Sequence, residues 1–155
     1  MAENKKVPNI IGEFKGEHGW LSNFHFHELE FEGLNYRAAE NAYQASKVDP
    51  ADTATRMLFC NLKPADAKRL GNSIKRRKDW TPELGLAMME KIATIKFQDK
   101  FLRDKLLATG DALLIEGNFW HDNFYGQCNC PKCKGVKGDN YLGKILMKVR
   151  SRLKK

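Results

Sequence analysis

Residues 40–47, ENAYQASK, carry two faces of different character on one predicted helix. At 3.6 residues per turn, Glu40, Gln44 and Lys47 place an acid, an amide and a base on one face. The other stripe, which starts at Ala38, consists of alanines, and such small side chains indicate close packing against another part of the fold. We therefore expect a tightly packed helix whose polar face contacts either solvent or a substrate.

Around this helix, the hydrophobic patterns predict short strands first and helices afterwards. Residues 24–31 alternate apolar and polar side chains, which is typical of half-buried strands, with a turn at Glu32-Gly33. Thr81 and Pro82 fit the N-cap and the first position of a long helix. Further strands are expected at residues 10–14 and 113–116, and further helices at 38–48, after 50, from 64 to about 71, at 101–107 and at 142–153, with a loop-rich region at 119–140.

These elements predict an α+β fold, namely a single compact, mostly helical domain with a small N-terminal β-sheet. A chain of 155 residues fits one domain, which can bury roughly 70% of the surface that the unfolded chain exposes. We expect residues 1–155 to form this domain, with flexible ends at 1–8 and 151–155. No apolar run approaches the roughly 20 residues of a membrane span, and no apolar signal core follows the first residues. We therefore expect a cytoplasmic protein with no membrane partner, and the sequence leaves its oligomeric state open.

The formal net charge of +8 predicts attraction to anions, such as nucleotides, nucleic acid or phosphorylated metabolites. Part of the excess lies at residues 75–78 and 144–155, where solvated helix faces and a soluble terminus also explain it. The charge alone therefore indicates anions as a class and does not choose among them.

Several common catalytic motifs are absent from the sequence: a glycine-rich phosphate loop, His-Glu-x-x-His and Gly-x-Ser-x-Gly. The acids that lie beside aromatic or glycine-rich sequence are Glu40, Asp79, Glu116 and Asp122. Trp80 is either a core residue or a stacking platform for a flat base or sugar. Residues 120–126, WHDNFYG, place aromatic side chains, a histidine and a carboxylate in a loop where no core periodicity demands them. Because binding residues concentrate in loops on a rigid scaffold, this loop is a candidate wall of a site.

Cys128, Cys130 and Cys133 offer three thiolates within six residues. They could begin a tetrahedral zinc site if a residue such as His121 or Cys60 supplied the fourth ligand. Reduced loop cysteines without a metal are the alternative, since cysteines of a cytoplasmic protein are usually reduced. The spacing does not decide between the two.

Seven pieces of sequence, in a fixed order, resemble one family. They are WLSNF at 20–24, Tyr36 with residues 40–47, Asp79-Trp80, Met89 with Lys96-Phe97, LATGD at 107–111, LIE at 114–116, and GDNYLG at 138–143 leading to Leu146-Met147 and Arg150. Together they resemble the NADAR domain, also called the YbiA-like family, over nearly the whole chain. The chain departs from the family pattern at Asn41, where histidine is frequent, at Tyr125, where tryptophan is frequent, and in its cysteine cluster.

The resemblance implies a mostly helical α+β domain with N-glycosidase activity and without a metal or other cofactor. Family members are associated with ribosyl N-glycosidic bonds, either in phosphorylated intermediates of riboflavin biosynthesis or in ADP-ribose attached to guanine of nucleic acid. The implied partners are therefore a phosphorylated ribosyl or ADP-ribosyl substrate, with ADP-ribosylated DNA as one form of it. Carried over by motif, the core of the site is Glu40, Trp80 and Asp122. The residues expected to bind substrate around it are Ser22, Asn23, Phe24, Tyr36, Lys47, Lys96, Tyr125 and Asn140.

Cleavage of a C1′–N bond builds positive charge on the ribose, so the site needs a carboxylate near that carbon and a group that activates water. We expect Glu40 and Asp122 to fill these roles, Trp80 to stack on the substrate, and Lys47 or Lys96 to hold phosphate. Two other functions fit the same sequence: a non-catalytic reader of ADP-ribose or nucleotide, and a basic nucleic-acid-binding module with a zinc-stabilised cysteine loop.

Overall fold

A computed structural model describes residues 8–155. Of the expected flexible N-terminal end, residues 1–7 lie outside the described residues, and Pro8 is exposed. The helices are α1 (Ala39–Ser46), α2 (Thr53–Met57), α3 (Pro64–Ser73), α4 (Pro82–Lys96), α5 (Lys100–Ala108) and α6 (Tyr141–Leu153), with 3₁₀ helices η1 (Gly16–Leu21) and η2 (Pro131–Cys133). The strands are β1 (Ile10–Ile11), β2 (Phe26–Phe31), β3 (Leu34–Ala38), β4 (Leu113–Leu114), β5 (Gly117–Asn118) and β6 (Gln127–Cys128).

Strands β2 and β3 form the predicted N-terminal sheet, an antiparallel hairpin that turns at Glu32-Gly33. Both turn residues have positive φ, 47° at Glu32 and 87° at Gly33. Two such residues in succession are the hallmark of a tight hairpin turn, and glycine adopts this region without steric cost. The hairpin leads directly into α1, so its geometry sets where that helix starts.

Helix α1 is buried along its whole length. Its alanine stripe is fully enclosed, because α1 packs against both α3 and α4. Asn41, at one of the positions that depart from the family pattern, donates through Nδ2 to the carbonyls of Phe59 and Leu62, 2.8 Å each. The predicted close packing of this helix is confirmed.

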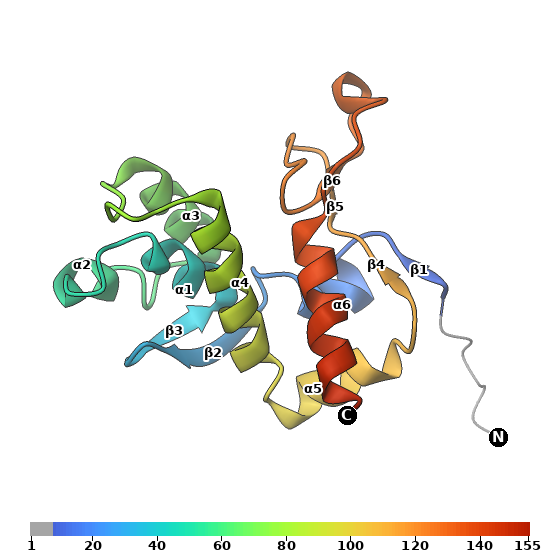
Figure 1. Ribbon diagram of the computed structural model, residues 1–155, viewed down its shortest axis with the longest axis horizontal. Helices are drawn as coiled ribbons and strands as arrows, with labels where there is room; N and C mark the ends of the chain where they lie inside the picture. Colours follow the sequence, from blue (N-terminus) through green and yellow to red (C-terminus); the bar gives the residue numbers. More distant parts are fainter. Residues whose placement is uncertain (1–7) are drawn as a thin grey trace.

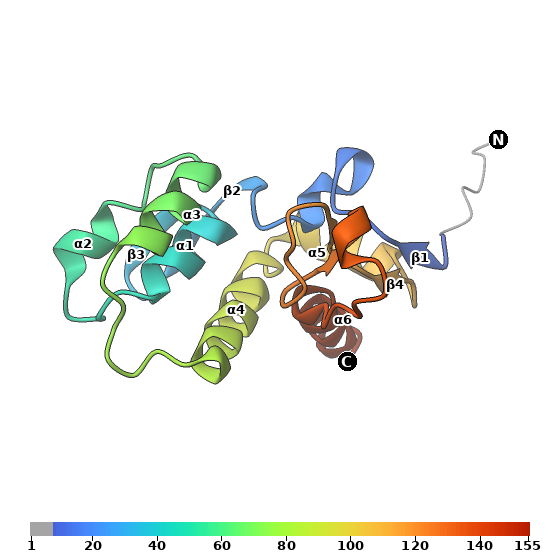
Figure 2. The ribbon, with the colours of Figure 1, turned by 90° about the horizontal axis from the view of Figure 1, so that it is seen from above.

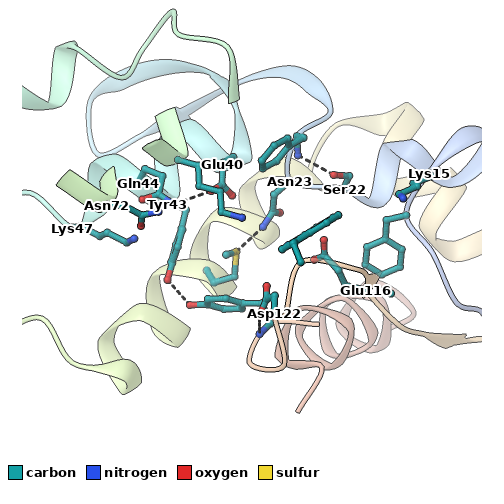
Figure 3. A pocket seen from close by; sticks show the side chains of 17 residues that line it. Lys15, Ser22, Asn23, Glu40, Tyr43, Gln44, Lys47, Asn72, Glu116 and Asp122 are labelled. Atoms are coloured by element: carbon teal, nitrogen blue, oxygen red, sulfur yellow. Dashed lines mark hydrogen bonds between the residues drawn. The ribbon is translucent and has the colours of Figure 1, made fainter. Parts of the chain in front are cut away.

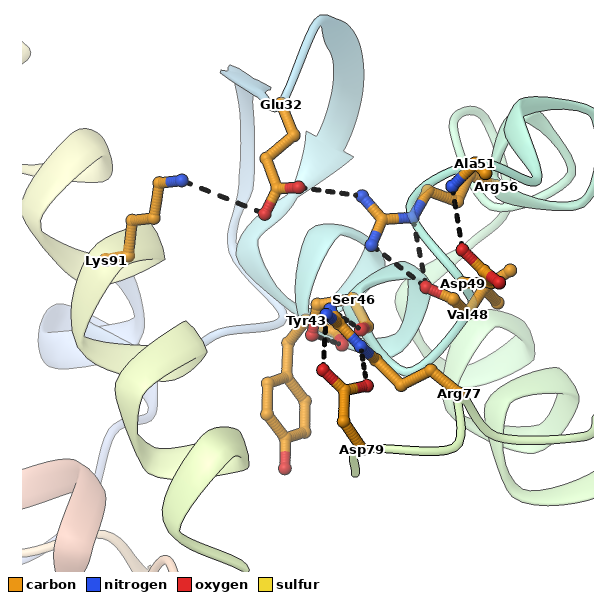
Figure 4. Close-up of polar contacts among 10 residues, drawn as sticks. All are labelled: Glu32, Tyr43, Ser46, Val48, Asp49, Ala51, Arg56, Arg77, Asp79 and Lys91. Atoms are coloured by element: carbon orange, nitrogen blue, oxygen red, sulfur yellow. Dashed lines mark hydrogen bonds and ion pairs between the residues drawn. The ribbon is translucent and has the colours of Figure 1, made fainter. Parts of the chain in front are cut away.

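Polar contacts fix the C-terminal end of α1 to its surroundings (Figure 4). The buried Arg56 donates from Nη2 to the carbonyl of Val48 at 2.9 Å and from Nη1 to Glu32 at 3.2 Å. One guanidinium thereby joins the chain after α1 to the turn of the hairpin. Arg77 pairs with Asp79, with 2.6 Å between Nε and Oδ1.

The other predicted helices are present with small shifts in their bounds. Thr81 caps α4 as expected, since its side chain accepts from the backbone N–H of Leu84 at 3.1 Å. Residues 151–153, expected to belong to a flexible end, continue α6, and Lys154 Nζ donates to Gly110 O at 3.1 Å. Within residues 8–155, no helix has the length and the apolar composition that crossing a membrane would need.

Two further strand pairings form, and one of them, β1 with β4, joins segments that are distant in sequence. Strand β1 pairs in parallel with β4, and β5 pairs in parallel with β6. The strand expected at residues 10–14 is shorter than predicted, because only Ile10 and Ile11 find partners on β4. Such long-range pairings leave little local signal in the sequence.

Figures 1 and 2 show how these parts are arranged. Helix α4 runs through the middle of the molecule and packs on α1 on one side and on α6 on the other. The hairpin, α1, α2 and α3 lie to one side of α4, whereas α5, α6 and the short paired strands lie to the other. The fold is thus an α+β domain in which two groups of elements share a central helix.

Candidate active site

A cavity of about 360 Å³ lies between these two groups of elements (Figure 3). This volume is in the range of small-ligand sites. One wall is α1, which we call the helix wall, and the facing wall is the segment from Glu116 to Tyr125, which we call the loop wall. The lining residues are Phe14, Lys15, Ser22, Asn23, Phe24, Glu40, Tyr43, Gln44, Lys47, Lys68, Asn72, Met89, Glu116, Gly117, Trp120, Asp122 and Tyr125.

The helix wall carries the polar stripe that the sequence predicts, and the stripe faces the cavity. Gln44 Nε2 donates to Glu40 Oε1 at 2.8 Å, which fixes the carboxylate within one turn of helix. Burial raises the pKa of Glu40, and the hydrogen bond from Gln44 opposes this rise. Burial lowers the pKa of Lys47 to about 8, and repulsion from Arg76 adds to that effect.

Gln44 is held from behind by Gly71 of α3. A Cβ atom at Gly71 would lie 1.9 Å from Gln44 Oε1, so a larger residue at this position would displace the amide. The close approach of α3 thus decides where the Gln44 side chain sits, and through it the orientation of Glu40.

One backbone hydrogen bond joins α1 to the WLSNF motif. Glu40 N donates to Asn23 O at 2.9 Å, and Asn23 Nδ2 contacts Met89 Sδ at 3.2 Å. Two of the sequence motifs that are about 20 residues apart therefore meet at one end of the cavity.

The loop wall is shaped by the fully buried Asn118. Its Nδ2 donates to Asp122 O at 2.8 Å, and its Oδ1 accepts from the backbone N–H groups of Trp120 and Asp122, both at 3.2 Å. Asp122 Oδ1 in turn accepts from the N–H groups of Phe124 and Tyr125, at 3.0 and 2.9 Å. One asparagine and one aspartate thus replace the regular hydrogen bonding that this loop lacks.

Glu116 is a third carboxylate at the cavity. The sequence shows Glu116 beside aromatic or glycine-rich residues, as it does Glu40 and Asp122. The family resemblance, however, does not imply a role for Glu116 in the site. Burial raises the pKa of Glu116 to about 7, and the charges of Asp122 and Glu40 add to the rise. The two walls therefore bring three carboxyl groups to one cavity.

Lysines from separate elements border the same cavity. Lys68 of α3 and Lys15, which precedes η1, place their Nζ atoms 5.7 and 6.0 Å from the ring centre of Trp120. Neither lysine was expected from the sequence, because each looks like an ordinary solvated charge. Only Trp120 carried a signal, as an aromatic residue in a loop without core periodicity.

Of the residues expected in the site, seven line the cavity, namely Ser22, Asn23, Phe24, Glu40, Lys47, Asp122 and Tyr125. The other four do not line the cavity and lie behind its walls: Trp80, Tyr36, Lys96 and Asn140. Trp80 is half-buried and packs edge-on against Tyr43, with 6.0 Å between ring centres. Tyr36 is fully buried in the core next to Phe31.

Lys96 and Asn140 support the walls through hydrogen bonds. Lys96 is 1% exposed and donates from Nζ to Ser22 O at 2.9 Å. Burial lowers the pKa of Lys96 to about 7, while the attraction of Glu116 acts in the opposite direction. Asn140 Oδ1 accepts from the N–H of Glu116 at 3.0 Å, and its Nδ2 donates to Leu114 O at 2.9 Å.

A pair of tyrosines links the two walls. The hydroxyls of Tyr43 on α1 and Tyr125 on the loop lie 2.6 Å apart, and their rings meet edge to face. Burial raises the pKa of Tyr43 to about 12, so its hydroxyl keeps its proton at neutral pH. Both tyrosines line the cavity, so this contact forms part of its boundary.

The loop wall continues into a cluster of possible metal ligands. His121, Cys128, Cys130 and Cys133 bring one ligand atom each into a group whose members lie within 4.8 Å of one another. Of the two fourth ligands that the sequence allowed, His121 therefore joins the cysteines and Cys60 does not. The group lies next to the cavity and outside its lining.

Comparisons with known proteins agree on one family. The profile of the NADAR domain matches residues 11–154. An N-glycosidase of Nostoc punctiforme is 33% identical over 141 residues, which cover 88% of this chain and 86% of that protein. A riboflavin biosynthesis protein of Vibrio vulnificus is 34% identical over 143 residues, but the match covers only 36% of its length. The NMR structure of the Escherichia coli protein YbiA superposes with a TM-score of 0.80 at 28% identity, over 99% of this chain and 89% of that one.

Proposed function

Because the chain belongs to the NADAR family, we propose that it is an N-glycosidase that hydrolyses the bond between a ribosyl C1′ and a nitrogen atom. The substrate is either ADP-ribose attached to guanine of nucleic acid or a phosphoribosyl intermediate of riboflavin biosynthesis. Two curated relatives, from Nostoc punctiforme and Escherichia coli, bear the name N-glycosidase, and the Vibrio vulnificus relative is named for riboflavin biosynthesis.

One observation carries this proposal: Glu40, which is 7% exposed, faces a cavity that also holds Glu116 and Asp122. Burial makes charge on the Glu40 carboxylate unfavourable and raises its pKa, although Gln44, Lys68 and Lys47 act in the opposite direction. A ribosyl group that develops positive charge during bond cleavage relieves this cost. The carboxylate therefore interacts more favourably with the transition state than with the neutral sugar.

The other two acids protonate the leaving group and activate water. Glu116, with its pKa raised to about 7, is close to half protonated at neutral pH and can give a proton to the departing nitrogen. Asp122 is held by two backbone N–H groups, so its second oxygen is free to orient and activate water. These assignments extend the two-acid scheme expected from the sequence.

The lysines supply the contacts to phosphate. Lys47 and Lys68 reach the cavity from α1 and α3, and a phosphate between them would raise the pKa of Lys47 from its lowered value of about 8. Lys96 supports Ser22 and does not line the cavity. Stacking on the flat part of the substrate falls to Trp120, which lines the cavity and is 51% exposed.

The test incubates wild type, Glu40→Gln and Glu30→Gln with two substrates, the ribosylamine intermediates of riboflavin synthesis and DNA that carries ADP-ribosyl guanine. Products are identified by mass spectrometry. Glu30 is an exposed residue of β2, so its variant controls for loss of a surface charge. We expect wild type and Glu30→Gln to release ribose 5-phosphate from the first substrate or ADP-ribose from the second, and Glu40→Gln to release neither. Binding without any product from either substrate would contradict the proposal and favour a non-catalytic reader.

A further inference from the structure

The cysteine cluster has the dimensions of a mononuclear metal site. His121 Nδ1 lies 3.3 Å from Cys130 Sγ, 3.4 Å from Cys133 Sγ and 3.9 Å from Cys128 Sγ. Zinc bonds of about 2.3 Å to sulfur and about 2.0–2.1 Å to nitrogen, at tetrahedral angles, separate neighbouring nitrogen and sulfur ligands by about 3.6 Å. The three observed distances bracket this value.

The four side chains come from the loop before β6 and from the stretch that follows it. Cys128 ends β6, Cys130 precedes η2, Cys133 ends η2, and His121 lies in the loop with a positive φ of 69°. A left-handed backbone is uncommon for residues other than glycine, although histidine adopts it more often than most of them. Here it belongs to the bend that brings the imidazole to the sulfurs.

Hydrogen-bond donors point at the sulfur atoms. The backbone N–H of His121 lies 3.3 Å from Cys128 Sγ, and that of Cys130 lies 3.5 Å from the same sulfur. Asn123 Nδ2 lies 3.5 Å from Cys133 Sγ. Such donors stabilise thiolates, and they commonly surround the thiolate ligands of zinc. All four cysteines of the chain are free of disulfides, so the three sulfurs are available as ligands.

We propose that His121, Cys128, Cys130 and Cys133 bind one Zn²⁺ ion in a closed site. Three thiolates and one imidazole in a tetrahedral arrangement are a ligand set typical of structural zinc. Four protein ligands leave no position for substrate, so this ion takes no part in bond cleavage. It stabilises the segment from His121 to Cys133, in which Phe124 is 36% exposed and so adds little to a hydrophobic core.

The zinc site also positions the loop wall of the cavity. Asp122 follows the ligand His121 directly, and Asn123 contacts the sulfur of Cys133. Fixing His121 therefore fixes the backbone on which Asp122 stands. This second step rests on the proposed function of Asp122, whereas metal binding itself does not.

The experiment measures zinc by inductively coupled plasma mass spectrometry in protein purified without chelator and dialysed after addition of Zn²⁺. Wild type is expected to hold about one zinc per chain, and Cys130→Ser and His121→Ala to hold at most a few tenths. Cys60→Ser is the matched control, because Cys60 is a free cysteine outside the cluster. Wild type that holds no zinc, or Cys130→Ser that holds as much as wild type, would overturn the proposal.

A second measurement needs no variant of the metal ligands, so it still tests the proposal if those variants fold poorly. Chelation of zinc from wild type and from Cys60→Ser is expected to lower Tm by roughly 10 °C, and re-addition of Zn²⁺ to restore it. An unchanged Tm in wild type would argue against a structural ion. Glu40→Gln is expected to keep its zinc and lose its activity, so failure of the metal site and failure of the proposed reaction give different results.

Discussion

The two walls of the cavity carry the same kind of chemistry on different kinds of backbone. Every residue of α1 is buried, and Glu40 is oriented by a side chain one helical turn away. The loop wall is partly exposed and lacks regular hydrogen bonding around Asp122, which Asn118 replaces with side-chain contacts. The helix wall is therefore fixed by packing, whereas the loop wall depends on a few polar contacts and on the cysteine cluster.

This difference has a consequence for the strength of each acid's contribution. Interactions of a charge strengthen as water is excluded, so Glu40 should act on a cationic transition state more strongly than the more exposed Asp122. The loop wall should instead control which substrate fits, because loops tolerate changes in sequence more readily than packed helices.

The largest expected effect is on turnover when the acid of the helix wall is neutralised. On whichever of the two substrates wild type cleaves, Glu40→Gln should lower kcat by a factor of ~10²–10⁴. Asp122→Asn should give a loss at the lower end of this range. Circular dichroism should show both variants folded. If Asp122→Asn lost more activity than Glu40→Gln, the acid of the helix wall would not make the larger contribution to turnover.

The next effect concerns the asparagine that shapes the loop wall. Asn118→Ala leaves the backbone N–H groups of Trp120 and Asp122 without their acceptor, so the free energy of unfolding should fall by about 1–3 kcal/mol. Denaturant unfolding measures this change, with Asn35→Ala as the control, because Asn35 is exposed on β3. Turnover should fall as well, since Asp122 loses its fixed backbone. A variant as stable as Asn35→Ala would show that the loop wall is held by other contacts.

A third prediction follows from the pKa of Glu116, which burial raises from 4.5 to about 7. The folded chain then binds more protons at this carboxyl than the unfolded chain does between these two pH values. The stabilising contribution is therefore fully present below about pH 4.5 and is lost as the pH rises through about 7. Relative to Glu116→Gln, wild type should lose on the order of 3 kcal/mol of unfolding free energy across this window.

Parallel denaturant titrations of wild type and Glu116→Gln at several pH values measure this difference. Lys96 does not obscure it, because its pKa is lowered to about 7 and its contribution changes above that value, with stability rising as the pH increases. A difference between the two proteins that stays constant from pH 4.5 to 7 would contradict the assigned environment of Glu116.

The same contrast decides how much could be predicted from the sequence. The helix wall could be predicted, because the 3.6-residue period places Glu40 and Gln44 on one face. The start of α4 could be predicted as well, from Thr81-Pro82. The family resemblance supplied Asp122 without its surroundings. Lys68 was missed, because only the tertiary contact of α3 with α1 distinguishes it from a solvated lysine.

The two tryptophans show most clearly that the sequence does not predict which side chains line the cavity. Trp80 was expected at the centre of the site, yet it packs behind Tyr43, and Trp120 lines the cavity instead. In the sequence the two tryptophans look alike, because Trp80 follows an acid and Trp120 lies in a polar loop. The direction in which a loop side chain points depends on contacts such as those of Asn118, which no local pattern encodes.

The smallest expected effect concerns the contact that joins the two walls. The hydroxyls of Tyr43 and Tyr125 are 2.6 Å apart in a partly buried place, so Tyr43→Phe and Tyr125→Phe should each cost about 0.5–1.5 kcal/mol of unfolding free energy. Because both variants remove the same hydrogen bond, the double variant should cost less than the sum of the two. Denaturant unfolding of all four proteins measures this coupling. Strict additivity would mean that the two hydroxyls do not interact with each other, and that the helix wall and the loop wall are held by their other contacts.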